Sequence, residues 1–155
     1  MQIKIVAIGK IKEAYLKQGL GDYKNRLSKY ARVSVLELPE EDIALRPKSE
    51  VKDREAQRLK KHTAGSQYVI ALDREGIELS SVELAQKLES LMIGGKSNIV
   101  FVIGGALGLD ESVIKAADLN LSLSKFTFTH QIARFVLLEQ LYRSFKIIKG
   151  EPYHY

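Results

Sequence analysis

The sequence predicts an α/β protein with a mostly parallel sheet, because short strand-like runs alternate along the chain with longer helix-like segments. Five runs have the length and composition of strands: Gln2 to Ile8, Val33 to Leu38, Tyr68 to Leu72, Asn98 to Ile103 and Leu119 to Leu123. Five segments have the periodicity of helices: Ile11 to Tyr30, Ser49 to Lys61, Ser81 to Ile93, Asp110 to Ala117 and Gln131 to Ile148. Such alternation is typical of a sheet flanked by helices.

Capping residues support two of these helices. Ser80 and Glu83 have the spacing of a capping box, which predicts a helix start at this point. Gly94-Gly95 predicts the end of the same helix. Gly150, two residues before Pro152, predicts the end of the last helix.

Length and composition predict one domain over residues 1–155. A chain of 155 residues with 45% hydrophobic content can bury a core that needs no disulfide or metal to hold it. No repeat or linker-like stretch interrupts it. The segment from Pro39 to Pro47, which contains Glu40-Glu41-Asp42, is the one stretch that we expect to be an exposed, mobile, acidic loop.

Composition also excludes several kinds of chemistry. The chain has no cysteine, so it has no disulfide, thiol nucleophile or cysteine-zinc site, and its three histidines are scattered. Metal-free chemistry is therefore favoured. The start, Met1 to Val6, alternates charged and apolar residues like a strand, unlike a signal peptide or membrane span, so we expect a cytoplasmic protein.

Basic residues gather in the first fifth of the chain. Residues 1–32 hold eight Lys or Arg and two acids, whereas the remainder holds sixteen and seventeen. The basic residues on the first predicted helix and its approaches are Lys10, Lys12, Lys17, Lys24, Arg26 and Lys29. These residues could bind RNA phosphates, or they could form an ordinary solvated helix face. The pI of 9.3 is also compatible with an enzyme that acts on a small anionic substrate.

Glycines follow the strand from Asn98 to Ile103, in the sequence Gly104-Gly105-Ala106-Leu107-Gly108. They indicate either a tight turn or a place where a ligand approaches the backbone. A dinucleotide fingerprint needs G-x-G-x-x-G, so this spacing disfavours a Rossmann-type oxidoreductase. Gly95-Lys96-Ser97 imitates the end of a P-loop but precedes a strand, where a P-loop would follow one.

The order of the remaining motifs is more specific. Leu72-Asp73 and Ile103-Gly104-Gly105 end two predicted strands, and they are followed by the Ser/Thr-rich segment Ser122 to Thr129, Arg134, the run Glu139 to Arg143 and Tyr153-His154. Over essentially its whole length the chain resembles the RlmH family of small SPOUT-class methyltransferases.

The resemblance implies a fold, a reaction and an assembly. The fold is the SPOUT-type α/β trefoil knot. The reaction is transfer of a methyl group from S-adenosylmethionine to N3 of a pseudouridine in 23S rRNA of the large ribosomal subunit, expected on assembled ribosomes. The assembly is a homodimer in which the tail of one chain completes the active site of the other, with no metal and no membrane.

Carried over by position, the S-adenosylmethionine site matches Leu72, Gly104, Leu123, Ser124, Lys125, Phe126, Thr127 and Phe128. Gly104 would let backbone approach the adenosyl group, and Leu72 and Leu123 would offer apolar surface to adenine. Without the resemblance, both leucines would pass for core residues. One departure is Thr129, where the family usually has Pro; Thr can still cap the following helix.

Four residues are expected to be catalytic: His154, Arg134, Arg143 and Tyr153. The N3 atom carries an imide proton that must leave, so Arg134 or Arg143 would stabilise the resulting anion or its phosphate while His154 accepts the proton. His130 is a weaker candidate, because a helix N-terminus would keep it neutral, and a structural role suits it equally.

Other residues near the C-terminus allow two interpretations each. Tyr153 and Tyr155 would stack on a splayed base or pack the chain end. Arg143, Lys146 and Lys149 would form a second phosphate-facing stripe or a solvated face, and Glu139 is expected to pair with Arg143.

A different class of function also fits the basic charge, namely an RNA- or ribosome-binding protein with a vestigial cofactor pocket. Cofactor preference would separate these functions, since the methyltransferase needs S-adenosylmethionine, the binder needs none and an oxidoreductase needs a dinucleotide.

Overall fold

The protein folds around one five-stranded sheet with the strand order β2-β1-β4-β3-β5, and the computed structural model describes residues 1–65 and 67–155. The strands are β1 (Gln2–Ile8), β2 (Arg32–Leu38), β3 (Tyr68–Glu78), β4 (Asn98–Ile103) and β5 (Leu119–Ser122). The helices are α1 (Ala14–Leu27), α2 (Lys48–Lys60), α3 (Ser81–Ile93), α4 (Glu111–Ala116) and α5 (His130–Ile148). The four pairings between neighbouring strands are parallel, which confirms the predicted class.

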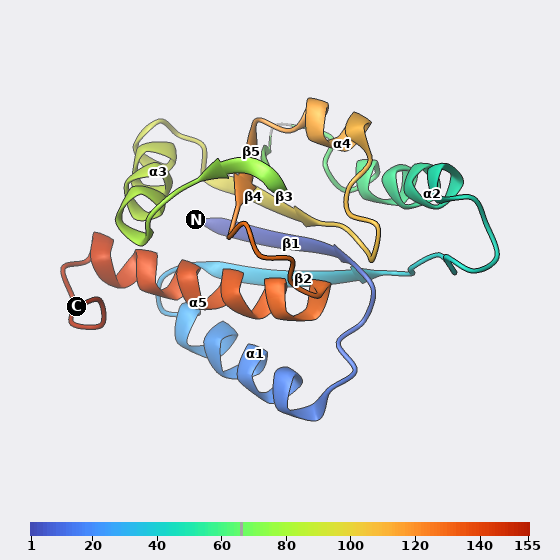
Figure 1. Cartoon of the computed structure of the whole chain (residues 1–155). Helices are drawn as coiled ribbons and strands as arrows, with labels where there is room; N and C mark the ends of the chain where they lie inside the picture. Colours follow the sequence, from blue (N-terminus) through green and yellow to red (C-terminus); the bar gives the residue numbers. More distant parts are fainter. Residues whose placement is uncertain (66) are drawn as a thin grey trace.

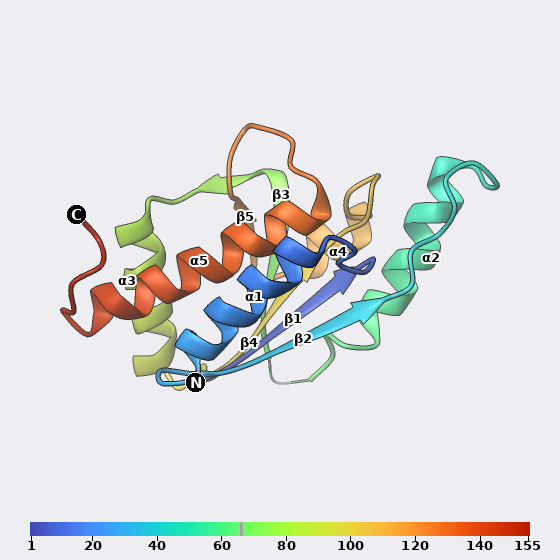
Figure 2. The same cartoon turned by 90° about the horizontal axis from the view of Figure 1, so that it is seen from below.

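Helices cover both faces of the sheet. One core cluster joins the sheet to α1, α3 and α5, and a second joins it to α2 and α4. Figure 2 shows α5 lying between α1 and α3 across the first face. The central strand β4 is buried along nearly all of its length, as expected for a strand with helices on both sides. No helix in the described part of the chain is long and apolar enough to cross a membrane.

Most predicted boundaries agree with the structure to within one residue or two. The capping box of Ser80 and Glu83 is confirmed, since the Ser80 side chain accepts from the Glu83 N–H and the Glu83 carboxylate accepts from the Ser80 N–H. Gly94 caps α3, and Gly150 follows the C-cap of α5 with φ +64°, a value that favours glycine.

Two elements differ from the prediction for identifiable reasons. Helix α1 spans Ala14–Leu27, whereas the prediction runs from Ile11 to Tyr30. It starts later because the Ile11 N–H donates to Glu37 Oε2 at 2.7 Å and holds the preceding segment in a loop. It ends earlier, at the cap residue Ser28. Strand β3 runs on to Glu78 because its pairing with β5 resumes after a register shift between Leu72 and Ile77.

The acidic loop from Pro39 to Pro47 is tied to α2. The Glu41 carboxylate pairs with Arg46 at 3.3 Å and with Arg58, and the Glu41 N–H donates to Glu55 Oε1 at 3.2 Å. The loop is largely exposed as expected, while its mobility stays a prediction.

A buried arginine fixes α5 to the sheet. Arg134, 1% exposed, donates to Glu37 Oε2 on β2 at 2.8 Å and to the Gly9 carbonyl after β1 at 3.0 Å. One side chain thus joins the last helix to the carboxyl ends of the first two strands. The trefoil knot stays an expectation from the family resemblance, because a strand order by itself does not show how the chain is threaded.

We expect Arg134→Ala to lower the free energy of unfolding by about 2–4 kcal/mol. The loss should be below that of a fully buried pair, because the Glu37 side chain is 36% exposed. Arg134→Met keeps much of the volume and should lose less. Urea unfolding with an unchanged m value measures both.

The matched control is Lys115→Ala, which removes an exposed pair with Glu111 and should cost less than about 0.5 kcal/mol. An Arg134→Ala stability equal to that of this control would contradict the anchoring role.

Candidate functional site

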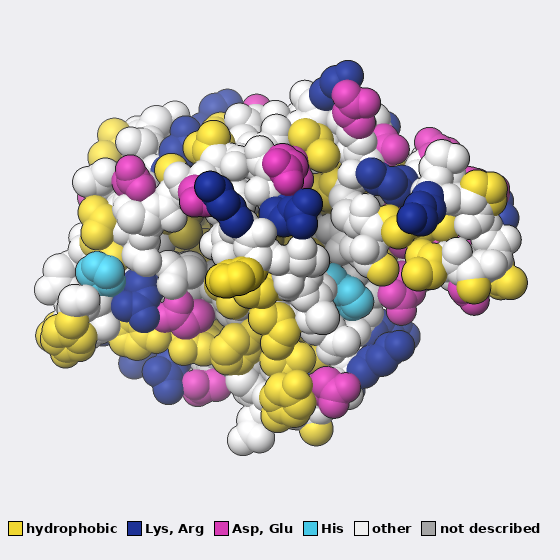
Figure 3. All heavy atoms as spheres, viewed as in Figure 1, with side chains coloured by type: hydrophobic (Ala, Val, Ile, Leu, Met, Phe, Trp, Pro, Cys, Tyr) yellow, Lys and Arg dark blue, Asp and Glu magenta, His cyan; other side chains and the backbone are white. Residues whose placement is uncertain are grey.

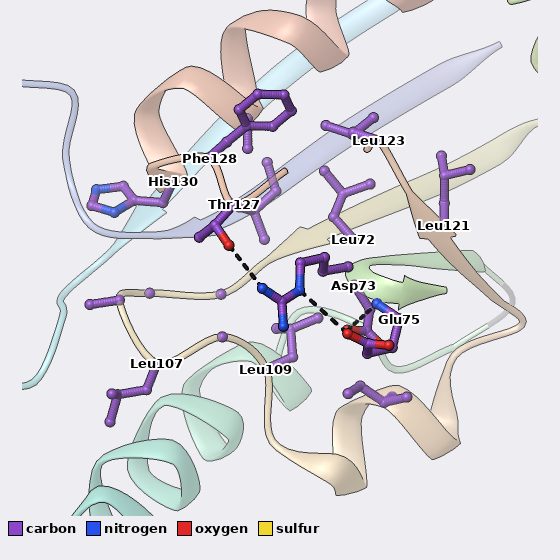
Figure 4. Close-up of a pocket in the computed structure, with 18 of the residues that line it drawn as sticks. Leu72, Asp73, Glu75, Leu107, Leu109, Leu121, Leu123, Thr127, Phe128 and His130 are labelled. Carbon is purple, nitrogen blue, oxygen red and sulfur yellow. Dashed lines mark hydrogen bonds and ion pairs between the residues drawn. The ribbon is translucent and has the colours of Figure 1, made fainter. Parts of the chain in front are cut away.

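A pocket of about 760 Å³ lies where the carboxyl ends of β4 and β5 meet the register shift in the middle of β3. Parallel strands present their carboxyl ends at one edge of a sheet, which is where α/β proteins commonly bind ligands. Its walls come from residues 72–75 in β3, 103–109 after β4, positions 121, 123, 124 and 126–128 in and after β5, and His130 and Ala133 of α5. Figure 4 shows these segments converging from separate elements.

Most residues expected to bind a cofactor lie around this pocket. They are Leu72, Gly104, Leu123, Ser124, Phe126, Thr127 and Phe128. Lys125 is exposed on the same loop but does not line the cavity. Leu72 lies within β3 and Leu123 directly after β5; both are half-buried and line the pocket, so their positions suit packing as well as ligand contact.

The glycine turn after β4 folds back on itself. A Cβ atom on Gly104 would lie 2.6 Å from the carbonyl carbon of Gly108 and 2.9 Å from the backbone nitrogen of Leu109. The Gly108 N–H donates to the Gly105 carbonyl at 3.0 Å, and Gly108 has φ +76°. The missing Cβ at Gly104 is therefore required by the turn itself, which then offers its backbone to the cavity.

A buried carboxylate lies beneath this turn. Glu55 on α2 is 3% exposed, and a Cβ on Gly105 would lie 2.9 Å from its Oε2 atom. Among the described residues, Oε2 has no hydrogen-bond partner. Burial raises the pKa of Glu55, with the Glu41 N–H and Arg58 opposing the shift. Sequence reasoning missed Glu55, although its spacing of four from Val51 and from Leu59 puts it on the buried side of α2.

Loop 123–129 is tied to β3 across the pocket. Arg74 donates to Thr127 Oγ1 at 2.9 Å, drawn as a dashed line in Figure 4. The Phe126 N–H donates to Ser124 Oγ at 3.0 Å, while the Phe126 ring stays 79% exposed. The loop therefore has a fixed base and an exposed aromatic side chain.

The first turn of α5 closes one side of the pocket. Thr129 caps this helix by accepting from the Ile132 N–H at 3.2 Å, as expected for this departure from the family pattern. Burial lowers the pKa of His130, and the charges of Arg134 and Lys12 act in the same direction. A neutral His130 agrees with the expectation, and burial is the main cause.

The expected catalytic residues near the C-terminus form a separate cluster. Arg143 donates to Glu139 Oε1 from Nε at 3.1 Å and from a terminal nitrogen at 2.7 Å, which confirms the predicted pair. The Tyr153 hydroxyl donates to the same oxygen at 3.1 Å and lies 3.3 Å from the Tyr23 hydroxyl. Burial and these hydrogen bonds raise the pKa of Tyr153. His154 Nδ1 lies 3.3 Å from Arg143.

The cluster and the pocket lie at opposite ends of α5. On α5 the pocket contacts His130 and Ala133, whereas the cluster uses Glu139 and Arg143, so about 15 Å of helix axis separates Ala133 from Arg143. Figure 1 shows the C-terminus beyond the end of α5 that is remote from the pocket. Arg134 belongs to neither group, because its guanidinium is engaged in the core. One chain therefore does not bring Arg134, Arg143, Tyr153 and His154 together at the pocket.

No group of three or more His, Asp or Glu side chains in the described ranges is placed to hold a metal ion. The polar side chains that line the pocket are Lys52, Asp73, Arg74, Glu75, Ser124, Thr127 and His130. They offer both charges to a ligand, between apolar walls.

Comparisons with known proteins agree with this arrangement. A family model described as "Predicted SPOUT methyltransferase" matches residues 1–154. The chain is 50% identical to the ribosomal RNA large subunit methyltransferase H of Acetivibrio thermocellus and 48% identical to that of Alkaliphilus oremlandii, each over 99% of both chains. A putative methyltransferase H of Methanococcus vannielii is also 48% identical over the same shares.

One solved structure shares the fold at low sequence identity. A probable methylase family protein from Haemophilus influenzae superposes with a TM-score of 0.51 and 14% identity, over 99% of this chain and 70% of that one. This similarity supports the fold alone.

We expect Glu55→Gln to change how stability depends on pH. Because the folded-state pKa of Glu55 is raised above 4.5, the folded wild type binds the proton more tightly than the unfolded chain, and wild-type stability falls as pH rises from 4.5 through the folded pKa. The variant lacks this loss. Its stability relative to wild type should therefore increase with pH in urea titrations from pH 4 to pH 8.

Glu89→Gln on the exposed side of α3 is the matched control. A stability difference for Glu55→Gln that stays constant across the pH range, or that decreases as pH rises, would show that the buried carboxylate carries no such penalty.

Proposed function

The chain belongs to the SPOUT methyltransferase family, and from this premise we propose that it transfers the methyl group of S-adenosylmethionine to N3 of a pseudouridine in 23S rRNA of the large ribosomal subunit. The observation that carries the proposal is the pocket. Three segments far apart in the sequence, each expected from the family resemblance to bind the cofactor, meet around one cavity at the carboxyl edge of the sheet.

The residues around the pocket fit S-adenosylmethionine. A volume of about 760 Å³ lies in the usual range for ligand pockets. Leu72, Leu109 and Leu121 supply apolar surface for a purine, while the carboxylates of Asp73 and Glu75 suit hydroxyl and ammonium groups. When bound, S-adenosylmethionine supplies a methyl group on a positively charged sulfur.

The substrate nitrogen must lose a proton for the reaction to proceed. If its pKa lies about two units above neutrality, deprotonation costs about 3 kcal/mol at pH 7. We propose that His154 accepts this proton and that Arg143 stabilises the anion. Arginine only donates hydrogen bonds, so in the contact between Arg143 and neutral His154 the acceptor is Nδ1 and the proton sits on Nε2. His154 must therefore leave Arg143 before Nδ1 can act as a base.

The separation of tail and pocket supports a homodimer. Since the tail packs back on Glu139 and Arg143, and about 15 Å of helix separates Arg143 from Ala133 at the pocket, the tail of a second copy is the natural source of these groups. Hydrophobic side chains gather over α1 and α5 in Figure 3, and Ile132, Phe135 and Val136 of α5 are only half buried. An apolar surface of this kind suits a partner subunit.

Assembled ribosomes are the proposed substrate, with residues 1–155 acting as one domain. In the described part of the chain each helix joins a core cluster on the single sheet, so the body that carries the pocket must also contact the RNA. A single domain of this size would bind RNA more tightly when the RNA presents a large preformed surface, as it does in an assembled ribosome.

We expect Gly104→Ala to weaken S-adenosylmethionine binding at least about tenfold, or about 1.4 kcal/mol, in calorimetric titration. The added Cβ would collide with the Gly108 backbone and displace the turn that borders the pocket. Gly21→Ala on α1 is the matched control, since nothing lies within 4 Å of its Cβ position. If both variants bound S-adenosylmethionine with equal affinity, the turn would not belong to the cofactor site.

We expect wild-type protein to transfer label from radioactive S-adenosylmethionine to large-subunit RNA in ribosomes from a strain lacking its own copy. His154→Ala and deletion after Gly150 should reduce labelling about 10²–10⁴-fold while leaving cofactor binding intact. His62→Ala near the end of α2 controls for loss of a histidine.

The alternatives predict different results. No label from wild type despite cofactor binding would mean that the proposed substrate is wrong. No cofactor binding would favour the RNA-binding protein with a vestigial pocket.

A further inference from the structure

A second, basic groove lies between the C-terminal ends of α1 and α5. These helices run side by side in the same direction, so their last turns are adjacent (Figure 2). The groove has a volume of about 620 Å³, and its charged lining consists of Arg26, Lys29, Lys146, Lys149 and Glu151. Four cations face one carboxylate, which leaves a surplus of three positive charges.

An adjoining hollow extends this charge. It has a volume of about 470 Å³, shares Lys29 with the groove and adds Lys24 and Arg32. Among the described residues, no salt bridge involves Lys24, Lys29, Arg32 or Lys149. Cations near helix C-termini are favoured by the helix dipole. That effect acts within the last turn of a helix and does not account for Arg32 on β2.

Aromatic rings lie between the cations of the groove. The Tyr142 ring centroid lies 5.8 Å from the Arg26 guanidinium carbon and 5.9 Å from Lys146 Nζ. Tyr30 packs against Tyr142 with centroids 6.2 Å apart. Alternating cations and aromatic faces are typical of surfaces that hold a nucleic acid backbone.

The groove already holds an anion from the protein itself. Glu151, the first residue after the turn that ends α5, accepts from Lys146 Nζ at 2.5 Å and from the Tyr30 hydroxyl at 2.6 Å. These two donors lower the pKa of Glu151, and Lys29 adds to the effect. A phosphate oxygen would find the same donors, together with Lys29 and Lys149.

We propose that this groove binds backbone phosphates of the RNA substrate and that Glu151 occupies the phosphate position until RNA displaces it. The inference rests on the proposed function, since it takes rRNA as the substrate. RNA suits the groove better than a small anion, because the cations continue into the second hollow and could contact successive phosphates. Displacement would also release the tail that starts at Glu151.

The test measures binding of purified large ribosomal subunits as a function of salt, without S-adenosylmethionine. We expect the double variant Lys29→Gln/Lys149→Gln to bind at least about tenfold more weakly at low salt. Its slope of log affinity against log salt should be smaller by about 0.7–0.9 for each phosphate that the variant no longer neutralises. Lys61→Gln/Lys115→Gln removes the same charge at the C-cap of α2 and on α4, across the sheet, and should bind like wild type.

Glu151→Gln should act in the opposite direction. Removing the resident carboxylate frees Lys146 and Tyr30, so binding should become about threefold tighter or more at the same salt. Weaker binding would mean that Glu151 only supports the structure and would overturn its role as a stand-in for phosphate. If both double lysine variants lost the same affinity for large subunits, the groove would not be a specific RNA-binding surface.

Two readouts keep this proposal separate from the proposed function. Binding to subunits needs no methyl transfer, so it is measurable even if wild type transfers no label. Calorimetric S-adenosylmethionine binding by each variant should match wild type. A variant that loses cofactor binding together with RNA binding would indicate general damage and contradict a local effect of the groove.

Discussion

The placement of α5 by Arg134 is the constraint on which the other functional features depend. Burying a guanidinium to this degree costs stability unless its donors are paired, and here the Glu37 carboxylate and the Gly9 carbonyl accept from the two terminal nitrogens, while Nε has no hydrogen-bond partner among the described residues. Both acceptors lie at the carboxyl ends of the first two strands. The first turn of α5 is thereby held beside the pocket, and the last turn is held beside α1.

The two ends of α5 then acquire different chemistry from their surroundings. At the pocket end, the walls are glycine backbone, apolar strand ends and a neutral histidine, an environment that selects by shape and by individual hydrogen bonds. At the tail end, cations and aromatic rings dominate, an environment that favours polyanions. A rigid helix keeps the two regions a fixed distance apart, and this separation motivates the proposal that two copies of the chain form the site.

The fold could be predicted from the sequence because its signals are local. The apolar runs Gln2 to Ile8 and Asn98 to Ile103 agree with the observed strands at both ends, and the capping box at Ser80 marks the start of its helix. The prediction for β3 is too short, because the extension of this strand depends on a register shift against β5 that residues near it in the sequence do not indicate. The start of α1 was misplaced for the same kind of reason, because Glu37 lies far along the chain from Ile11.

The candidate site was predicted only in part. Motif positions identified most of the pocket lining, and the i, i+4 spacing identified the pair of Glu139 and Arg143. Long-range packing decided the rest. The sequence does not show that Arg134 is enclosed in the core or that Glu55 supports the glycine turn, since both facts depend on strands brought together by folding. The catalytic roles of Arg134, Arg143, Tyr153 and His154 stay predictions.

The close approach of distant segments to glycines limits how this chain can evolve. At Gly19 and Gly105 an added methyl group would lie within 3 Å of the Phe135 and Glu55 side chains respectively. Every single-codon replacement of glycine adds at least that methyl group. Change at these positions therefore requires a second, compensating change elsewhere in the chain, so the glycines and their contact residues are expected to vary together among relatives.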